Sequence, residues 1–350
     1  MDLFEALEWS HWKNLPLELK TQVMNQVLMY FVSPLKKVSD VIFQQFELDG
    51  VKCQSFECLI DGERFVLIPG KKDAILGWKA GISGLAHDAW DTTGDLTDPA
   101  YATIRKNYGL QTVKDWDDFV NESTTPLRKR SISPMLVQKK ARPVGTRYLG
   151  DLNMITGEFK GDQTTFGKIK KEFFAYFQKP QSFEESLAVK LPEEIFCENK
   201  FYAVLSDKTA TYAIYHHQSC SLDQLRERVK EQVFDLPTED QWEYLVSAAT
   251  RKLFRWGNDL REDQSYYGEK VSRQIKQENM FGLKFSGELD HWEVTADNYL
   301  KLEQMTAVGN DVYDHLPLAS YYRSHRLIAV DEALDPSDYY FRKIILIQKD

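Results

Sequence analysis

The chain has 350 residues, of which 43% are hydrophobic and 28% charged, and its formal net charge is −9. These values are typical of a globular protein with a sizeable core and one large or two ordinary domains. The acidic balance argues against nucleic acid as a partner, because phosphate backbones attract proteins rich in lysine and arginine. The apolar run of residues 27–32 is far too short to cross a membrane, so we expect no membrane partner either.

The first 50 residues predict an N-terminal helical segment. Leu19, Val23, Val27 and Phe31 recur every four residues and would form one apolar face of a helix, which Pro34 interrupts. We therefore expect a helical segment over residues 1–50, followed by a domain over residues 51–350.

The pattern changes after residue 50. Residues 51–70 alternate around Asp61-Gly62, a dipeptide that suits the tight turn of a β-hairpin. Residues 79–122 are rich in glycine, aspartate and aromatic residues, and we expect a long irregular insertion with one short helix. A second hairpin is expected within residues 130–148.

Two helix starts carry a capping box, in which a hydroxyl and a glutamine three residues later satisfy each other's backbone amides. Ser221 and Gln224 form one such pair, and Thr238 and Gln241 form the other. After the second pair, apolar residues follow at the spacing of a single buried helix face: Trp242, Leu245, Val246 and Ala249. Residues 201–217 predict a strand, a cap and a further helix.

The four cysteines are Cys53, Cys58, Cys197 and Cys220. None belongs to a Cys-x-x-Cys pair, and their spacing suits no common zinc site. We expect buried free thiols in a reducing compartment. The acidic and aromatic N-terminus does not look like a secretory signal, so we expect a cytoplasmic location.

Several strings resemble, in the same order, those of the formylglycine-generating enzyme (sulfatase-modifying factor) family. They are RFVLIPG (64–70), LPTEDQWEY (236–244), FRWGN (254–258), NMFGLKFSGELDHWEVT (279–295) and YFRKIIL (340–346). The resemblance implies an α+β, elaborated C-type-lectin-like domain with little regular secondary structure. It implies structural roles for Pro237, Thr238, Glu239, Trp242, Glu243, Trp256, Gly257, Gly282, Trp292 and Glu293.

The chemistry of that family does not carry over to this chain. Its enzyme oxidises a substrate cysteine with Cu(I), which two cysteines hold near the C-terminal end of the domain, and Cu(I) needs such soft ligands. The last cysteine here is Cys220, so residues 221–350 supply no thiolate. We expect neither copper-dependent oxidation nor any catalytic residue or cofactor. The resemblance allows structural calcium, with Glu293 as the candidate ligand.

The resemblance also implies a peptide-binding groove beside the C-terminal segment. That segment offers Tyr321, Tyr322, Arg323, His325 and Arg326, and arginine side chains suit carboxylate groups. We therefore expect a binding or interaction protein for a peptide, a protein or a small anionic ligand. Two alternatives stay open. One is an enzyme with an unrecognised non-copper site. The other is a structural subunit of an assembly, in which the N-terminal helix docks.

Overall fold

The computed structural model describes residues 2–85, 99–177, 191–206, 209–260, 270–285, 291–306 and 310–349. The chain divides into two compact units. Unit 1 consists of Met1–Arg142, Arg226–Val330 and Tyr340–Asp350, and unit 2 of Pro143–Leu225 and Asp331–Tyr339. Helices and antiparallel strands alternate irregularly along the chain, which confirms the α+β class.

The main sheet of unit 1 has five strands in the order β1-β2-β3-β6-β18, and all neighbours are antiparallel. Their bounds are Val38–Leu48, Val51–Ile60, Glu63–Ile68, Met135–Gln138 and Ile344–Leu346. The β2–β3 turn is made by Asp61 and Gly62, with φ angles of 51° and 83°. These left-handed values are typical of a tight hairpin turn, so this prediction is confirmed.

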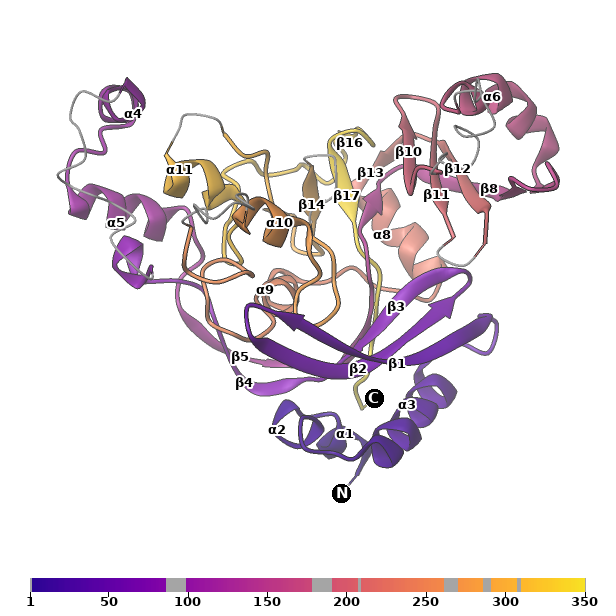
Figure 1. Ribbon diagram of the computed structural model, residues 1–350, viewed down its shortest axis with the longest axis horizontal. Coiled ribbons are helices and arrows are strands. Elements are labelled where there is room, and N and C mark those ends of the chain that lie inside the picture. Colours follow the sequence, from indigo (N-terminus) through magenta and orange to yellow (C-terminus); the bar gives the residue numbers. More distant parts are fainter. Residues whose placement is uncertain are drawn as a thin grey trace. The chain divides into compact units, whose positions relative to one another are not determined.

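Three helices lie on one side of β1 and β2 (Figure 1): α1 (Leu3–Ala6), α2 (Trp9–Trp12) and α3 (Leu17–Phe31). They belong to the same compact unit as the main sheet. The helical prediction is wrong for residues 38–48, which form β1, because β-branched and aromatic residues favour a strand there. The buried face of α3 is Lys20, Val23, Met24 and Val27.

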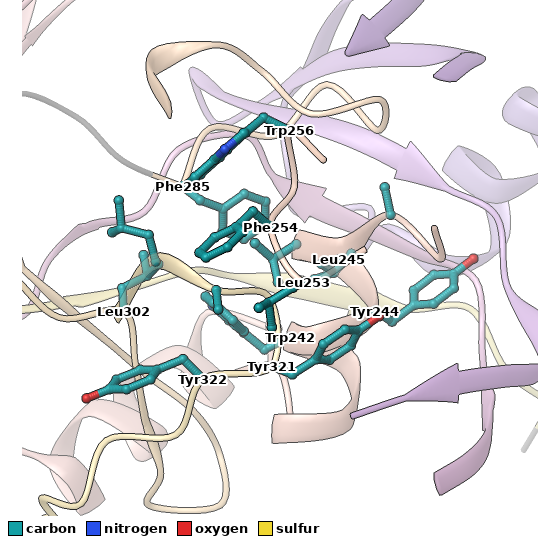
Figure 2. Close-up of a cluster of buried hydrophobic side chains, with 14 of the residues drawn as sticks. Trp242, Tyr244, Leu245, Leu253, Phe254, Trp256, Phe285, Leu302, Tyr321 and Tyr322 are labelled. Atoms are coloured by element: carbon teal, nitrogen blue, oxygen red, sulfur yellow. The ribbon is translucent and has the colours of Figure 1, made fainter. Parts of the chain in front are cut away.

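Helix α9 (Glu239–Ser247) passes through the core of unit 1. Thr238 and Gln241 form both bonds of the predicted capping box, at 3.3 and 2.9 Å. Trp242, on the buried face of α9, packs in a cluster with Phe254 and Tyr321 (Figure 2). Trp242 is fully buried and Trp256 is 2% exposed, as expected of large aromatic residues that pack in a core.

The two expected structural glycines, Gly257 and Gly282, and the expected proline, Pro237, lie in loops around this core. Gly282 has a φ of +76°, and a Cβ there would lie 2.5 Å from the Phe46 ring, so only glycine fits. Gly257 exchanges two backbone hydrogen bonds with Phe254, and the Pro237 carbonyl accepts one from the Ala296 amide.

The other elements of unit 1 are short. The paired strands β4 (Lys71–Leu76) and β5 (Arg128–Ile132) show that no hairpin spans residues 130–148, since β5 pairs with β4 and β6 with β3. Of the predicted insertion, residues 86–98 lie outside the described residues. The remainder contains more helix than expected: η1 (Gly81–Gly84), α4 (Pro99–Tyr108) and α5 (Val113–Glu122). Further elements are α10 (Lys270–Lys276), β14 (Trp292–Val294), β15 (Leu300–Lys301), α11 (Asp311–His315) and η2 (Leu316–Leu318).

Unit 2 has a five-stranded antiparallel sheet in the order β10-β11-β12-β8-β9. The strands are β8 (Thr146–Asn153), β9 (Phe159–Gly161), β10 (Glu194–Cys197), β11 (Phe201–Leu205) and β12 (Thr211–His217). Helix α6 (Gln163–Ala175) contributes Phe166, Ile169 and Phe173 to a shared core with the sheet. The helix predicted within residues 201–217 is therefore wrong, because its apolar residues alternate along β12 instead.

Strands β13 (Cys220–Ser221) and β16 (Ala333–Leu334) form a small pair in unit 2. Three further elements contain the points at which the chain passes from one unit to the other: β7 (Arg142–Pro143), α8 (Leu222–Glu231) and β17 (Tyr339–Phe341). The start of α8 has the predicted capping box, since Ser221 and Gln224 bond to each other's backbone amides at 3.1 and 3.3 Å.

Candidate functional site: a cavity between helix α3 and strands β1 and β2

The five residues predicted to line a groove do not share an open surface. Tyr321 is fully buried and Tyr322 is 8% exposed, and the Tyr322 hydroxyl donates to Glu303 Oε2 at 2.6 Å. Arg323 binds Glu239 through its Nε at 2.8 Å and through Nη2. Only His325 and Arg326 are exposed, and the Arg326 guanidinium lies 5.1 Å from the Trp292 ring centroid.

Arg323 belongs to an ionic cluster at the start of α9. Buried Lys301 lies 2.8 Å from both Glu239 Oε1 and Glu243 Oε1, and its ammonium also donates to the Tyr322 carbonyl at 2.9 Å. Arg128 donates to Glu243 Oε2 at 2.9 Å. Burial raises the pKa of Glu239, but bonds from Arg323 and Lys301 outweigh burial and leave the pKa below its ordinary value. The predicted motif residues Glu239 and Glu243 are thus structural ion-pair partners.

Glu293, the calcium candidate, is fully buried and forms an ion pair with Arg342. Arg342 Nε donates to Oε1 at 2.8 Å, and Nη2 donates to Oε2 at 3.4 Å. The same guanidinium also binds the backbone carbonyls of Gln138, Lys139 and Lys284. Both carboxylate oxygens are therefore used within the protein. The described residues hold no group of three or more His, Cys, Asp or Glu side chains placed for a metal ion.

A cavity of about 200 Å³ lies elsewhere in unit 1, between the N-terminal helices and the β1–β2 hairpin. Its lining contains three lysines, two tryptophans, two glutamines and one cysteine, and no acidic residue. These residues are Trp9, Trp12, Lys13, Lys20, Gln45, Lys52, Cys53 and Gln54. Such a lining offers positive charge, amide groups and aromatic surface to a ligand.

Lys20 is the unusual member of this lining, because it is only 1% exposed. Its ammonium donates to Gln54 Oε1 at 3.4 Å and lies 5.4 and 5.9 Å from the ring centroids of Trp12 and Phe43. No carboxylate in the described part of the chain forms an ion pair with it. Burial lowers the pKa of Lys20 below its ordinary value. Burial also raises the pKa of Cys53 to about 12, so this neighbour is a neutral thiol at ordinary pH.

Hydrogen bonds fix the groups around Lys20. The Trp12 indole N–H donates to the Gln54 carbonyl at 2.9 Å, which ties α2 to β2. The Gln54 side chain accepts from Lys20 and donates to Gln45 Oε1 at 3.2 Å, which sets the direction of its amide. The surrounding backbone is also anchored, because the Trp9 amide donates to the Gly70 carbonyl at 2.8 Å. The cavity is therefore built by several elements at once.

The other two lysines of the cavity are exposed. Lys52 pairs with Glu47 at 3.0 Å, and both side chains are about half exposed, so water screens this pair. Lys13 lies just after α2. A cation close to a cavity, with little water around it, attracts an anion more strongly than exposed lysines do. The chemistry of the site is therefore that of an anion receptor with an aromatic wall.

Sequence reasoning missed this cavity, although a signal was present. Lys20, Val23, Met24 and Val27 follow the i, i+3, i+4, i+7 spacing of one helix face. The apolar face predicted instead contained Leu19, which is 40% exposed. A lysine within a buried stripe marks a position where a charge enters the interior.

Comparisons with known proteins concern unit 2. A family model described as a profilin-like domain of unknown function (DUF7278) matches residues 147–216. This segment extends from β8 to β12 and is a fifth of the chain. No curated protein matches the chain.

The predicted membership of the formylglycine-generating enzyme family is wrong. The profilin-like match falls in the middle of the residues assigned to that family's domain, and no sign of that family is found. Parts of the strings that suggested it have other roles here: Thr238 begins a capped helix, and Glu293 forms an ion pair with Arg342.

The structure also shows the state of the cysteines and the nature of the described helices. All four cysteines are free thiols, and Cys53, Cys58 and Cys220 are buried. Among the helices that the structure describes, none is both long and apolar enough to cross a bilayer.

Proposed function

We propose that the protein is a binding protein for a small anionic ligand, and that the cavity beside α3 holds it. The observation that carries the proposal is Lys20, a buried lysine that forms no ion pair with a carboxylate of the described residues. A buried charge without a counter-charge costs free energy of folding. An anion that binds beside it would recover that cost, which gives the ligand a source of affinity.

The cavity has room for an anion of modest size. Its volume of about 200 Å³ is below the roughly 300–1,000 Å³ of pockets that enclose drug-sized ligands. Trp9 supplies flat apolar surface, and the amides of Gln45 and Gln54 supply hydrogen bonds that orient a carboxylate or phosphate. An enzymatic role, a role as a subunit of an assembly, and a cytoplasmic location remain predictions of the sequence.

Isothermal titration calorimetry with benzoate and benzamide tests the proposal. The two probes share shape and aromatic ring, but only benzoate carries a charge. We expect benzoate to bind and benzamide to bind at least tenfold more weakly, because a charged hydrogen bond contributes about 1.5–3 kcal/mol. Acetate and inorganic phosphate carry a charge but no ring, so their affinities, measured in parallel, show whether the ring or the charge contributes more to binding.

The control variants separate this site from general attraction to lysines. Lys20→Met keeps the length of the side chain but removes its charge, and should weaken benzoate binding about tenfold or more. Lys114→Met removes an exposed lysine of α5 whose side chain is 81% exposed, and should leave binding unchanged. Equal benzoate affinity in the wild type and Lys20→Met would overturn the proposal.

A further inference from the structure

The edge strand of the main sheet of unit 1 contributes one residue to the lining of the cavity. Strand β1 is the outermost strand of this sheet, and Gln45, which lines the cavity, belongs to it. One side of β1 pairs with β2, from Val38↔Ile60 to Leu48↔Val51. No strand in the described part of the chain pairs with its other side. Backbone N–H and C=O groups on such a side can pair with an added chain.

The part of β1 beside the cavity lacks the usual protection of an edge. Proteins discourage pairing at edges with charges, prolines or bulges. The irregularity in β1 lies between Ser39 and Ile42, at the far end from the cavity. From Ile42 to Leu48 the register with β2 is continuous, and Glu47 is the only charged residue. This regular segment is therefore suited to accept a further strand.

The charge of the cavity lining indicates which end of a bound peptide would lie there. Its lining has three lysines and no acidic residue, and of these lysines Lys52 is paired with Glu47. Lys13 and Lys20 remain as cations that attract an anionic group. The volume admits the end of a chain rather than a large ligand. A carboxyl terminus combines an extended backbone with an anion at its end.

We propose that unit 1 binds the carboxyl-terminal end of an extended peptide. The peptide pairs with the free side of β1 over Ile42–Leu48, and its terminal carboxylate enters the cavity beside Lys20. Backbone pairing supplies affinity with little dependence on sequence, and the carboxylate fixes the register. The inference rests on the proposed anion site and names the class of its ligand.

A synthetic pool of pentapeptides with random residues and free carboxyl ends tests the proposal. The pool is passed over the immobilised 350-residue protein, and retained peptides are identified by mass spectrometry. We expect the wild type and Lys114→Met to enrich peptides at least tenfold over Lys20→Met. The same pool with amidated carboxyl ends should show no enrichment. Enrichment that is equal for the acid and amide pools, or equal on wild type and Lys20→Met, overturns the proposal.

Methylation of single backbone nitrogens in an enriched peptide tests the pairing without altering the protein. In a strand that pairs on one side, only every second amide donates to its neighbour. We expect methylation at one alternating set of positions to weaken binding at least tenfold, and methylation at the other set to change it less than twofold. Effects that show no alternation contradict addition to β1.

The two proposals fail in different ways. Benzoate binding that depends on Lys20, together with no enrichment from the peptide pool, rejects the peptide inference and leaves the anion site in place. Absence of both benzoate binding and peptide enrichment rejects both.

Discussion

Two buried lysines of unit 1 differ in what surrounds them. Lys301 is fully buried, and its ammonium meets two carboxylates and a backbone carbonyl within 2.9 Å. Lys20 is 1% exposed, and its ammonium meets one amide oxygen at 3.4 Å and the faces of two aromatic rings. An ammonium has three donors, so the first lysine is satisfied within the described structure and the second is not.

Lys301 and Lys20 are both buried, so burial of a charge does not by itself mark a functional site. A charge with its full set of partners contributes to the fold, and removal of one partner leaves the others unpaired. A charge without a counter-charge costs stability, and such a cost is typical of positions that bind or react. In this protein the satisfied cluster lies where the sequence predicted a groove, and the unsatisfied lysine lies beside the cavity.

The largest expected effect comes from Lys301→Met. This change leaves Glu239 and Glu243 in the interior with one cation fewer, and breaking a buried pair costs about 3–5 kcal/mol. We expect a fall of that size in the free energy of unfolding, measured with urea. A fall below about 1 kcal/mol would show that the cluster is not a structural unit.

Lys20→Met should act in the opposite direction in the absence of ligand. Methionine fills a similar volume and removes a charge that forms no ion pair in the described structure, so the free energy of unfolding should rise by about 1 kcal/mol or more. The same urea titration measures it, with Lys114→Met as the control for loss of a lysine. A loss of stability in Lys20→Met would contradict the contrast between the two lysines.

A smaller effect is expected in the pH dependence of stability. Burial lowers the pKa of Lys20 below its ordinary 10.5 in the folded state. Below the folded pKa both states are protonated and the full cost of burial is present. Between the folded and unfolded pKa values the unfolded state binds more protons, so wild-type stability rises with pH. The advantage of Lys20→Met should therefore be largest near neutral pH and shrink as the pH rises toward 10.5.

The thiol of Cys53, which lies beside Lys20, does not obscure this pH window. The pKa of Cys53 is raised to about 12, so its thiol stays neutral over the same range. Urea titrations of both proteins at about pH 7, 9 and 11, which reach past the ordinary pKa of 10.5, measure the difference. A stability difference that is constant over this range would show that Lys20 does not titrate differently in the folded and unfolded states.

Local chemistry in the sequence predicted local structure well. The capping boxes at Thr238 and Ser221 and the Asp61-Gly62 turn depend on residues three or fewer positions apart, so short strings determine them. The same locality explains the wrong family. A string such as LPTEDQWEY specifies a capped helix with a buried face, and many folds use such a helix.

The ionic cluster at the start of α9 and the cavity beside α3 both consist of residues that lie far apart in the chain. Sequence patterns do not show which distant residues meet in the fold. The family resemblance predicted that Arg323 faces a ligand. Its actual partner, Glu239, lies 84 positions away, and no local pattern shows that pairing. The cavity joins α2 and α3 to the β1–β2 hairpin, and the bond from Lys20 to Gln54 spans 34 positions of the chain. Only the position of Lys20 within the buried stripe of α3 could be read from the chain itself.

The pKa of the Lys20 ammonium reports directly whether an anion binds beside this lysine. Nuclear magnetic resonance of protein labelled at the lysine side chains follows this group through a pH titration, and Lys20→Met assigns its signal. We expect a pKa below 10.5 in the free protein and a higher pKa when benzoate is saturating, because an anion nearby favours the charged form. An identical pKa of Lys20 with and without benzoate would contradict the binding of an anion beside this lysine.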